Sequence, residues 1–121
     1  MFNSDNKFDI QLEQGQIAER RLAKLLAGKI EVKSESYLWR RTGNICVEYE
    51  QNGKPSGIAA TEADWWAHEL MDDEREQTVA IILVPVERMH QLCSMARKHE
   101  NGGDGGRFKN YLIRIVDIFR W

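Results

Sequence analysis

Cysteine is scarce in this sequence, and its pattern excludes the sites that cysteine usually builds. Cys46 and Cys93 are the only two, and they lie far apart without a second pair. A Cys-rich zinc site and a Cys-x-x-Cys redox motif are therefore excluded, and we expect both thiols to be reduced core residues. Histidine adds little, because His68, His90 and His99 are too scattered to nominate as metal ligands.

Long hydrophobic runs are also absent. The longest run, residues 79–86, is far below the roughly 20 residues that cross a bilayer. The N-terminus lacks the basic start and the continuous apolar stretch of a signal peptide. We therefore expect a cytoplasmic protein that does not bind a membrane.

Neither sign of charge dominates the chain. The 17 Lys and Arg residues against 19 Asp and Glu residues give a net charge of −2, which supplies no global attraction for nucleic acid. Basic clusters at 20–24, 40–41 and 98–109 leave open either a polarised binding face or plain solvated surfaces. A length of 121 residues with 42% hydrophobic and 30% charged residues indicates one globular domain over residues 1–121.

The first half of the chain predicts a helix followed by two strands. Over residues 12–27 the apolar side chains fall on one helical face, and Gly28 ends the helix. Residues 29–35 alternate as in a strand, which places three charged residues on one face: Glu31, Lys33 and Glu35. A polar connection over 37–43 leads to a second strand over 44–51, which ends at an Asn-Gly turn.

The second half predicts alternating helices and strands. We expect a helix over 62–71, a strand over 78–84, a helix that starts at Pro85, a flexible glycine-rich break over 101–106 and a closing strand over 111–119. The unbroken apolar run of 78–84 is typical of a central strand covered on both faces. The order α-β-β-α-β-α-β predicts an α/β fold with a mixed sheet flanked by helices.

Carboxylates gather on the two expected strands of the first half. If these strands pair as a hairpin, Glu31 and Lys33 lie beside Glu48 and Glu50. Like charges that face each other across strands cost stability unless a cation neutralises them, and oxygen ligands favour Mg²⁺ or Mn²⁺. The alternative is a hairpin with one solvated face, on which glutamate opposite lysine is an ordinary cross-strand pair.

Two adjacent tryptophans fall within the expected helix over 62–71. Neighbouring helical residues point about 100° apart, so both cannot be central to one apolar stripe. Trp66 is the expected core residue. Three roles remain open for Trp65: stacking on a base, covering a dimer interface or packing at the edge of the core.

Three segments of the chain belong together, namely residues 15–26, the run Lys29-Ile30-Glu31-Val32 and the run Ile45-Cys46-Val47-Glu48-Tyr49-Glu50. Together they resemble the archaeal Holliday junction resolvases of the PD-(D/E)XK nuclease superfamily. In this resemblance Glu19 takes the place of the acidic residue on the first helix, Glu31 that of the metal-binding aspartate and Glu48 that of the signature glutamate. Glu50 stands where the superfamily usually has lysine, and Lys33 could approach the same site from the neighbouring strand.

An ordered series of short motifs also resembles small phage-type and prophage-type nuclease-like proteins. The motifs are Glu31-Val32-Lys33, Thr42-Gly43-Asn44, Glu48-Tyr49-Glu50 and Lys54-Pro55-Ser56-Gly57-Ile58, followed by Thr61 and Ala63-Asp64-Trp65. Together the resemblances imply a restriction-endonuclease-like fold, a phage or prophage origin and a homodimer. They also imply an Mg²⁺-dependent DNA endonuclease that acts on branched, Holliday junction-like DNA.

The roles that follow from the resemblance are those of metal-assisted hydrolysis. Glu31, Glu48 and Glu50 would bind Mg²⁺ or Mn²⁺, Glu19 would complete the shell and Lys33 would orient the attacking water. Four loop residues are candidate DNA contacts, namely Arg40, Arg41, Ser56 and Gly57. Two alternatives remain open: a non-catalytic nuclease-fold module whose acidic patch binds a basic protein, and an unrelated α/β domain with a solvated acidic hairpin.

Overall fold

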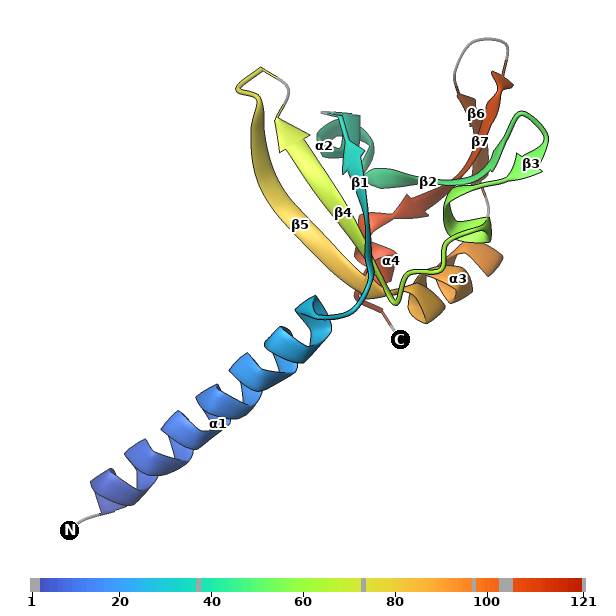
Figure 1. Cartoon of the computed structure of the whole chain (residues 1–121). Helices are drawn as coiled ribbons and strands as arrows, with labels where there is room; N and C mark the ends of the chain where they lie inside the picture. The colour runs from blue at the N-terminus through green and yellow to red at the C-terminus, as the bar shows by residue number, and fades with distance from the viewer. Residues whose placement is uncertain (1–2, 37, 73, 97, 103–105, 121) are drawn as a thin grey trace.

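The computed structural model describes residues 3–36, 38–72, 74–96, 98–102 and 106–120 of the chain. This part contains two small β-sheets with several helices, so the expected mixed α/β class is confirmed (Figure 1). The helices are α1 (Asn3–Leu26), α2 (Leu38–Thr42), α3 (Val86–Ser94) and α4 (Ile115–Ile118), and η1 (Gly57–Ala59) is a short 3-10 helix. The strands are β1 (Ile30–Glu35), β2 (Asn44–Gln51), β3 (Lys54–Pro55), β4 (Trp65–Asp72), β5 (Gln77–Pro85), β6 (Lys98–Gly102) and β7 (Phe108–Arg114).

The strands divide into two sheets of different topology. Sheet A has the order β1-β4-β5, with β1 parallel to β4 and β5 antiparallel to β4. Sheet B has the order β3-β2-β7-β6 and is antiparallel throughout. The expected hairpin between β1 and β2 is therefore wrong. The connection between them holds the helix α2 instead of a tight turn, and it carries the chain from one sheet into the other.

The expected helix over 62–71 is also wrong, because residues 65–72 form the central strand of sheet A. In β4 the buried residues Trp66, His68 and Leu70 alternate toward the core. This strand pairs with β1 on one side and with β5 on the other. Two ladders of backbone hydrogen bonds and the burial of alternate side chains outweigh the helix preference of its Ala, Glu, Leu and Met residues.

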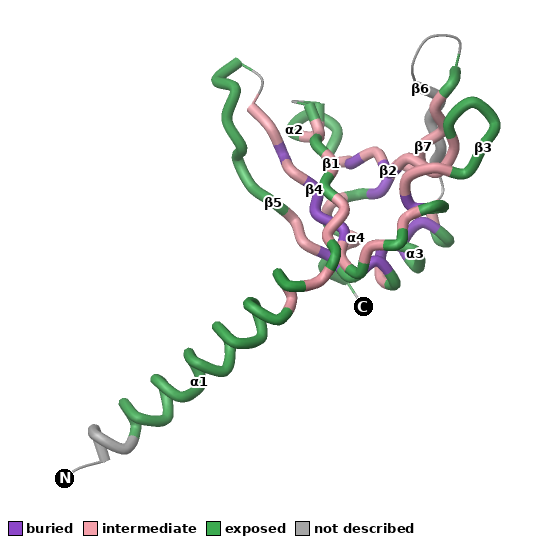
Figure 2. The backbone as a smooth tube through the Cα atoms, in the orientation of Figure 1, coloured by how far each residue is buried: buried purple, intermediate pink, exposed green. Residues whose placement is uncertain are grey.

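The strand β5 matches the expected strand over 78–84, but it is not central. It forms one edge of sheet A, and its residues 77–81 are exposed, as the green tube of Figure 2 shows. Only the inward side contributes to the core, mainly through the buried Val84. The expectation of cover on both faces is therefore wrong for the described part of the chain.

The last third of the chain departs from expectation only in part. Pro85 precedes α3, and Met89, Leu92 and Cys93 are buried on it as expected. A strand, β6, occupies 98–102, which the sequence did not predict, while 103–105 of the expected glycine-rich break lie outside the described residues. The expected closing strand over 111–119 is β7 up to Arg114, where the chain turns into α4.

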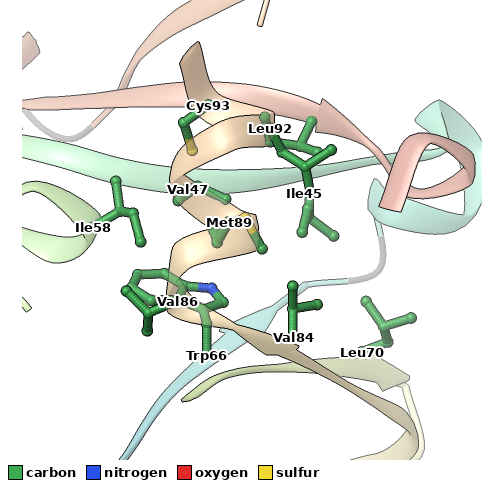
Figure 3. Packing of buried hydrophobic residues seen from close by; sticks show 11 residues of the cluster. Ile45, Val47, Ile58, Trp66, Leu70, Val84, Val86, Met89, Leu92 and Cys93 are labelled. Atoms are coloured by element: carbon green, nitrogen blue, oxygen red, sulfur yellow. The ribbon is translucent and has the colours of Figure 1, made fainter. Parts of the chain in front are cut away.

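The hydrophobic core lies between the two sheets and α3. Ile45 and Val47 of β2 point toward Trp66 and Val84 of sheet A, and Met89 of α3 fills the space among them (Figure 3). These side chains are almost completely shielded from solvent. The core therefore joins elements that lie far apart in the sequence, and it confirms Trp66 as a core residue.

The helix α1 lies apart from this core. It projects from the sheets as a single rod, and every side chain described along it is exposed or only partly buried (Figures 1 and 2). Among the described elements, none makes an extensive contact with it. The expected helix over 12–27 is confirmed, and it begins earlier, at Asn3.

Candidate functional site

The charged side chains of β1 lie on the core side of sheet A. Glu31 pairs in register with Trp66, and Lys33 with His68. Residues in register on neighbouring strands share a face of the sheet, and both Trp66 and His68 are fully buried. The opposite side of the strand carries Val32, which is 60% exposed. The alternative of a hairpin with its charged face in solvent is therefore wrong for β1.

Glu31 forms the centre of a small polar group on this face. The Lys33 ammonium lies 3.4 Å from Glu31 Oε2, and the Thr61 hydroxyl donates to Glu31 Oε1 over 2.9 Å. Lys33 Nζ also lies 5.9 Å from the centre of the Trp66 ring. About one third of each charged side chain remains exposed, at 32% for Glu31 and 35% for Lys33. The group is thus held in place and open to a ligand.

A surface depression adjoins the Glu31 carboxylate. It has a volume of about 430 Å³ and is lined by residues 29–32 and 61–63. The start of β1 forms one wall, and the segment that precedes β4 forms the other. This is the opening through which a phosphate group or hydrated ion can approach Glu31.

Glu48 lies on β2 of sheet B. The helix η1 packs on β2 so closely that a Cβ on Gly57 would overlap the Glu48 carbonyl oxygen. From Gly57 the chain makes one turn, with Thr61 N–H donating to Gly57 O over 2.9 Å, and Thr61 then contacts Glu31. This turn connects the backbone of Glu48 to Thr61 and so to Glu31. The Glu48 side chain lies on the side of β2 opposite to the buried Ile45 and Val47.

Glu50 has a different neighbour. Its carboxylate lies 3.0 Å from Lys109 Nζ, and the two residues pair across β2 and β7. The hydrogen bond that Lys109 donates to Glu50, and then the negative charge of Glu50, raise the pKa of Lys109 above the ordinary lysine value. The ladder is irregular between Glu48 and Glu50. Glu50 is therefore engaged in a cross-strand ion pair.

Glu19 is the expected site residue that the structure places farthest from the sheets. It lies on the exposed helix α1, about 10 Å along the helix from its end at Leu26 at 1.5 Å per residue. The structure thus brings Glu31 and Lys33 together, while Glu48 lies on a strand of the other sheet. It leaves Glu19 and Glu50 outside this group.

The donor set at Glu31 suits a hard divalent cation. Among the described residues, no three His, Cys, Asp or Glu side chains are grouped so that they could hold a metal ion. Mg²⁺ does not need such a cage, because it usually keeps several waters and takes one or two carboxylates together with phosphate oxygens. The Glu31 carboxylate could supply one such ligand.

The arginines expected to contact DNA lie on α2. Arg40 lies 3.8 Å from Asp72 and stacks on Trp39 with its guanidinium 5.4 Å from the ring centre. Both Arg40 and Arg41 are exposed. They offer positive charge at the surface beside the end of β4.

Ser56 and Gly57 have a structural role that the sequence did not reveal. Gly57 has a φ of +51° and lies against the Glu48 backbone, which explains the need for glycine there without a phosphate. The Ser56 hydroxyl is buried and has no hydrogen-bond partner among the residues that the structure describes. These residues first of all anchor η1 to β2.

A buried polar network lies behind the Glu31 group, and sequence reasoning missed it. Trp66 Nε1 donates to His68 Nδ1 over 3.0 Å, so the His68 proton is on Nε2, which donates to Glu35 Oε1 over 2.8 Å. The same Glu35 oxygen accepts from the Cys46 amide at 2.5 Å. The signal was the alternation of Trp66, His68 and Leu70, which a helical assignment of this segment conceals.

Comparison of the chain with protein-family models, with curated proteins and with solved structures found no match. Among the described residues no helix combines the length and apolar content needed to cross a membrane.

Proposed function

We propose that this protein is a metal-dependent endodeoxyribonuclease whose reaction centre is the Glu31 group. The observation that carries the proposal is the contact of 3.4 Å between the Lys33 ammonium and the Glu31 carboxylate on a partly open strand face. Phosphodiester hydrolysis needs a carboxylate to hold a divalent ion and a cation near the phosphate oxygens that gain charge. Glu31 and Lys33 supply both groups within one strand.

The metal in this proposal is Mg²⁺ or Mn²⁺, held by Glu31 and Glu48. When bound, it would polarise the phosphate and lower the pKa of a water molecule to make it a nucleophile. Thr61 fixes one Glu31 oxygen by its hydrogen bond, which orients the carboxylate and leaves the other oxygen toward Lys33. Glu19 could join the metal ligands only if α1 moved toward the sheets. Glu50 could join them only if its ion pair with Lys109 opened.

Lys33 has the role of placing positive charge at the reaction centre. Its ammonium lies between the Glu31 carboxylate and the Trp66 ring, and both contacts restrain the side chain. An ammonium held in this way can stabilise the charge that develops on a phosphate oxygen and orient the attacking water. The surface arginines Arg40 and Arg41 would contact the DNA backbone, since charge contacts of this kind position the duplex without reading its sequence.

The finer parts of the proposal rest on the resemblance in the sequence. They are the restriction-endonuclease-like fold, a substrate of branched, Holliday junction-like DNA, and a homodimer that cuts two strands symmetrically. The structure supports only the coarser part, a mixed α/β architecture in which β1 carries Glu31 and Lys33 on one face.

One observation favours a second candidate, a non-catalytic nuclease-fold module that binds a protein partner. Glu50 stands where the superfamily usually has lysine, and in the structure it is paired with Lys109. A chain that has lost the lysine of the signature can retain its acidic surface for a basic protein. This candidate predicts a folded protein that binds its partner and cuts no DNA.

The test is cleavage of labelled linear, flapped and four-way junction DNA in Mg²⁺, Mn²⁺ or EDTA. We expect metal-dependent cutting by the natural chain and a loss of at least about 100-fold in Glu31→Gln and in Lys33→Gln, because each removes one charge from the reaction centre. Calorimetric titration of Mn²⁺ should show weaker binding in Glu31→Gln and almost unchanged binding in Lys33→Gln.

A matched control is Glu87→Gln, which makes the same change at an exposed position in the first turn of α3. It should cut DNA at the rate of the natural chain. Equal cutting by Glu31→Gln would contradict the assignment of the site. If no substrate is cut while the protein is folded and binds metal, the non-catalytic module is supported instead.

A further inference from the structure

The helix α1 carries an apolar face that nothing in the described chain covers. Phe8, Leu12, Leu22 and Leu26 are between 52% and 64% exposed. At 100° per residue these four fall within about 80° of arc, so they lie on one side of the helix. Glu19 interrupts the face at its middle and separates the two leucines of the C-terminal half from the N-terminal pair.

A second uncovered apolar face lies on the outer side of sheet A. Val32 of β1 and Ile81 of β5 are each 60% exposed. The register places Ala67 of β4, which is 5% exposed, beside Val32 and also beside Leu83. Glu69 lies on the same side beside Ile81 and accepts from the hydroxyl groups of Ser34 and Thr78, so the face is apolar near Ala67 and polar near Glu69. Trp65 lies on the same side, two residues before Ala67. Two sides of a sheet are normally covered when both are apolar.

These two faces belong to one chain and do not meet within it. The link between α1 and β1 is short and is fixed at both ends. Gly28 N–H donates to Leu25 O over 3.1 Å, while Lys29 O accepts from the amides of Asp64 and Trp65 and Lys29 N–H donates to the Asp64 carboxylate. A Cβ on Gly28 would lie 3.2 Å from that carboxylate. The link is therefore held in the conformation that directs α1 away from its own sheet.

We propose that the occupant of the outer face of sheet A is α1 of a second copy of this chain. The two copies exchange their helices, so that each α1 covers the sheet of the other with its apolar side. Exchange of identical elements is a common route to symmetric dimers, since every contact that one copy makes is repeated by the other. This inference does not depend on the nuclease proposal.

The dimensions of the two faces match. A helix of 24 residues is about 36 Å long, and the nine residues of β5 span about 30 Å. A contact about 30 Å long and roughly 10 Å wide covers on the order of 300 Å² on each surface. Two reciprocal contacts then bury about 1,200 Å², which lies at the lower end of the range for stable interfaces.

Two substitutions test the exchange from its two sides. Light scattering of the full chain on a sizing column should give a dimer, while Leu22→Asp on the helix and Ile81→Asp on the sheet should each give a monomer at the same concentration. The carboxylate that each introduces would be buried without a partner in the dimer. Val32→Asp repeats the test on the other edge of the sheet, and circular dichroism checks that each variant is folded.

A mixing experiment separates the exchange from other dimers. Immobilised Leu22→Asp chain, which keeps an intact sheet, should retain Ile81→Asp chain, which keeps an intact helix. It should not retain a second Leu22→Asp chain, because that pair has no intact contact. As a matched control, Val116→Asp on α4 replaces another exposed apolar residue and should leave the dimer unchanged.

Two results would overturn the proposal. A monomeric natural chain would mean that no second copy covers the sheet, whether or not α1 returns to its own sheet. A dimer that Leu22→Asp dissociates and that both sheet variants leave intact would mean that α1 pairs with another α1.

Discussion

One oxygen atom of Glu35 connects three strands. It accepts from His68 of β4 at 2.8 Å and from the Cys46 amide of β2 at 2.5 Å, while Glu35 itself belongs to β1. His68 is fully buried, and Trp66 holds its other ring nitrogen. A buried polar group of this kind is stable only when each member has its partner. Glu35 therefore fastens sheet A to sheet B beside the hydrophobic core.

Glu35→Ala should lower the free energy of unfolding by about 3 kcal/mol, because it removes one partner from a buried pair and leaves His68 and the Cys46 amide unsatisfied. Urea unfolding followed by tryptophan fluorescence measures this loss. The exposed Glu62 serves as the control, and Glu62→Ala should change the value by less than about 0.5 kcal/mol. A loss in Glu35→Ala no larger than in this control would show that the network contributes no stability.

Glu69 should make stability depend on pH in the acid range. Hydroxyl groups of Ser34 and then of Thr78 donate to its carboxylate and hold its pKa below the ordinary value of 4.5. A carboxyl whose pKa is lower in the folded state stabilises the protein above the unfolded value, and this stability is lost as the pH falls below about 4.5. Thermal unfolding should therefore show a smaller drop in Tm between pH 6 and pH 3 for Glu69→Gln than for the natural chain. An equal drop would exclude this contribution.

Several residue assignments could be made from the sequence alone, because they follow from alternation. The shared face of Glu31, Lys33 and Glu35 follows from the period of a strand, and the structure confirms it. What alternation cannot tell is which of the two faces is inside. The solvated alternative placed the charged face outside, and it is wrong because the hydrogen bonds of Glu35 and Glu31 hold it on the core side.

At the scale of elements, β4 shows why the sequence misled. Thr61 and Asp64 have the spacing of a helix cap, and Trp66, Ala67 and Leu70 have the spacing of a helical stripe. In the structure Asp64 accepts from the Lys29 amide at the entry to sheet A, and Thr61 contacts Glu31. This segment is a strand because it pairs with β1 and β5, which are distant in the sequence or follow it. The residues of the segment alone do not reveal this pairing.

Two glycines allow the contact of η1 with β2 to be tested. Gly53 and Gly57 both have positive φ, of 79° and 51°, but only Gly57 lies against another segment. Gly53→Ala should cost about 1 kcal/mol for its backbone conformation. Gly57→Ala should cost about 2 kcal/mol more, because its Cβ would overlap the Glu48 carbonyl. Unfolding in urea compares the two variants, and equal losses would contradict the close approach.

The boundaries of helices and strands were best predicted where a local turn motif ends the element. The strand over 44–51 coincides with β2, and the turn at Asn52 and Gly53 has both residues at positive φ as that dipeptide predicts. The strand β6 and the helix α4 were missed, because neither carries a periodic pattern long enough to recognise. A short element of this kind is fixed mainly by what it packs against.

At the scale of the whole molecule, the polar and apolar surfaces are distributed unevenly. The core side of sheet A holds both the Glu31 group and the hydrophobic cluster, while the outer side carries the exposed Val32 and Ile81 and the hydrogen-bonded Glu69. A helix exchanged between two copies would cover this outer side and leave the Glu31 group open to a ligand. The two proposals thus use opposite faces of the same sheet.

The two sheets alternate along the sequence, which has a consequence for how the chain acquires its structure. β1 belongs to sheet A, β2 to sheet B, β4 and β5 to sheet A and β7 to sheet B. Asn44 at the start of β2 pairs with Arg114 at the end of β7, so sheet B requires closure of a very long loop. Such a high contact order predicts slow folding. During synthesis, Ile45 and Val47 stay without their sheet partner until β7 has emerged from the ribosome.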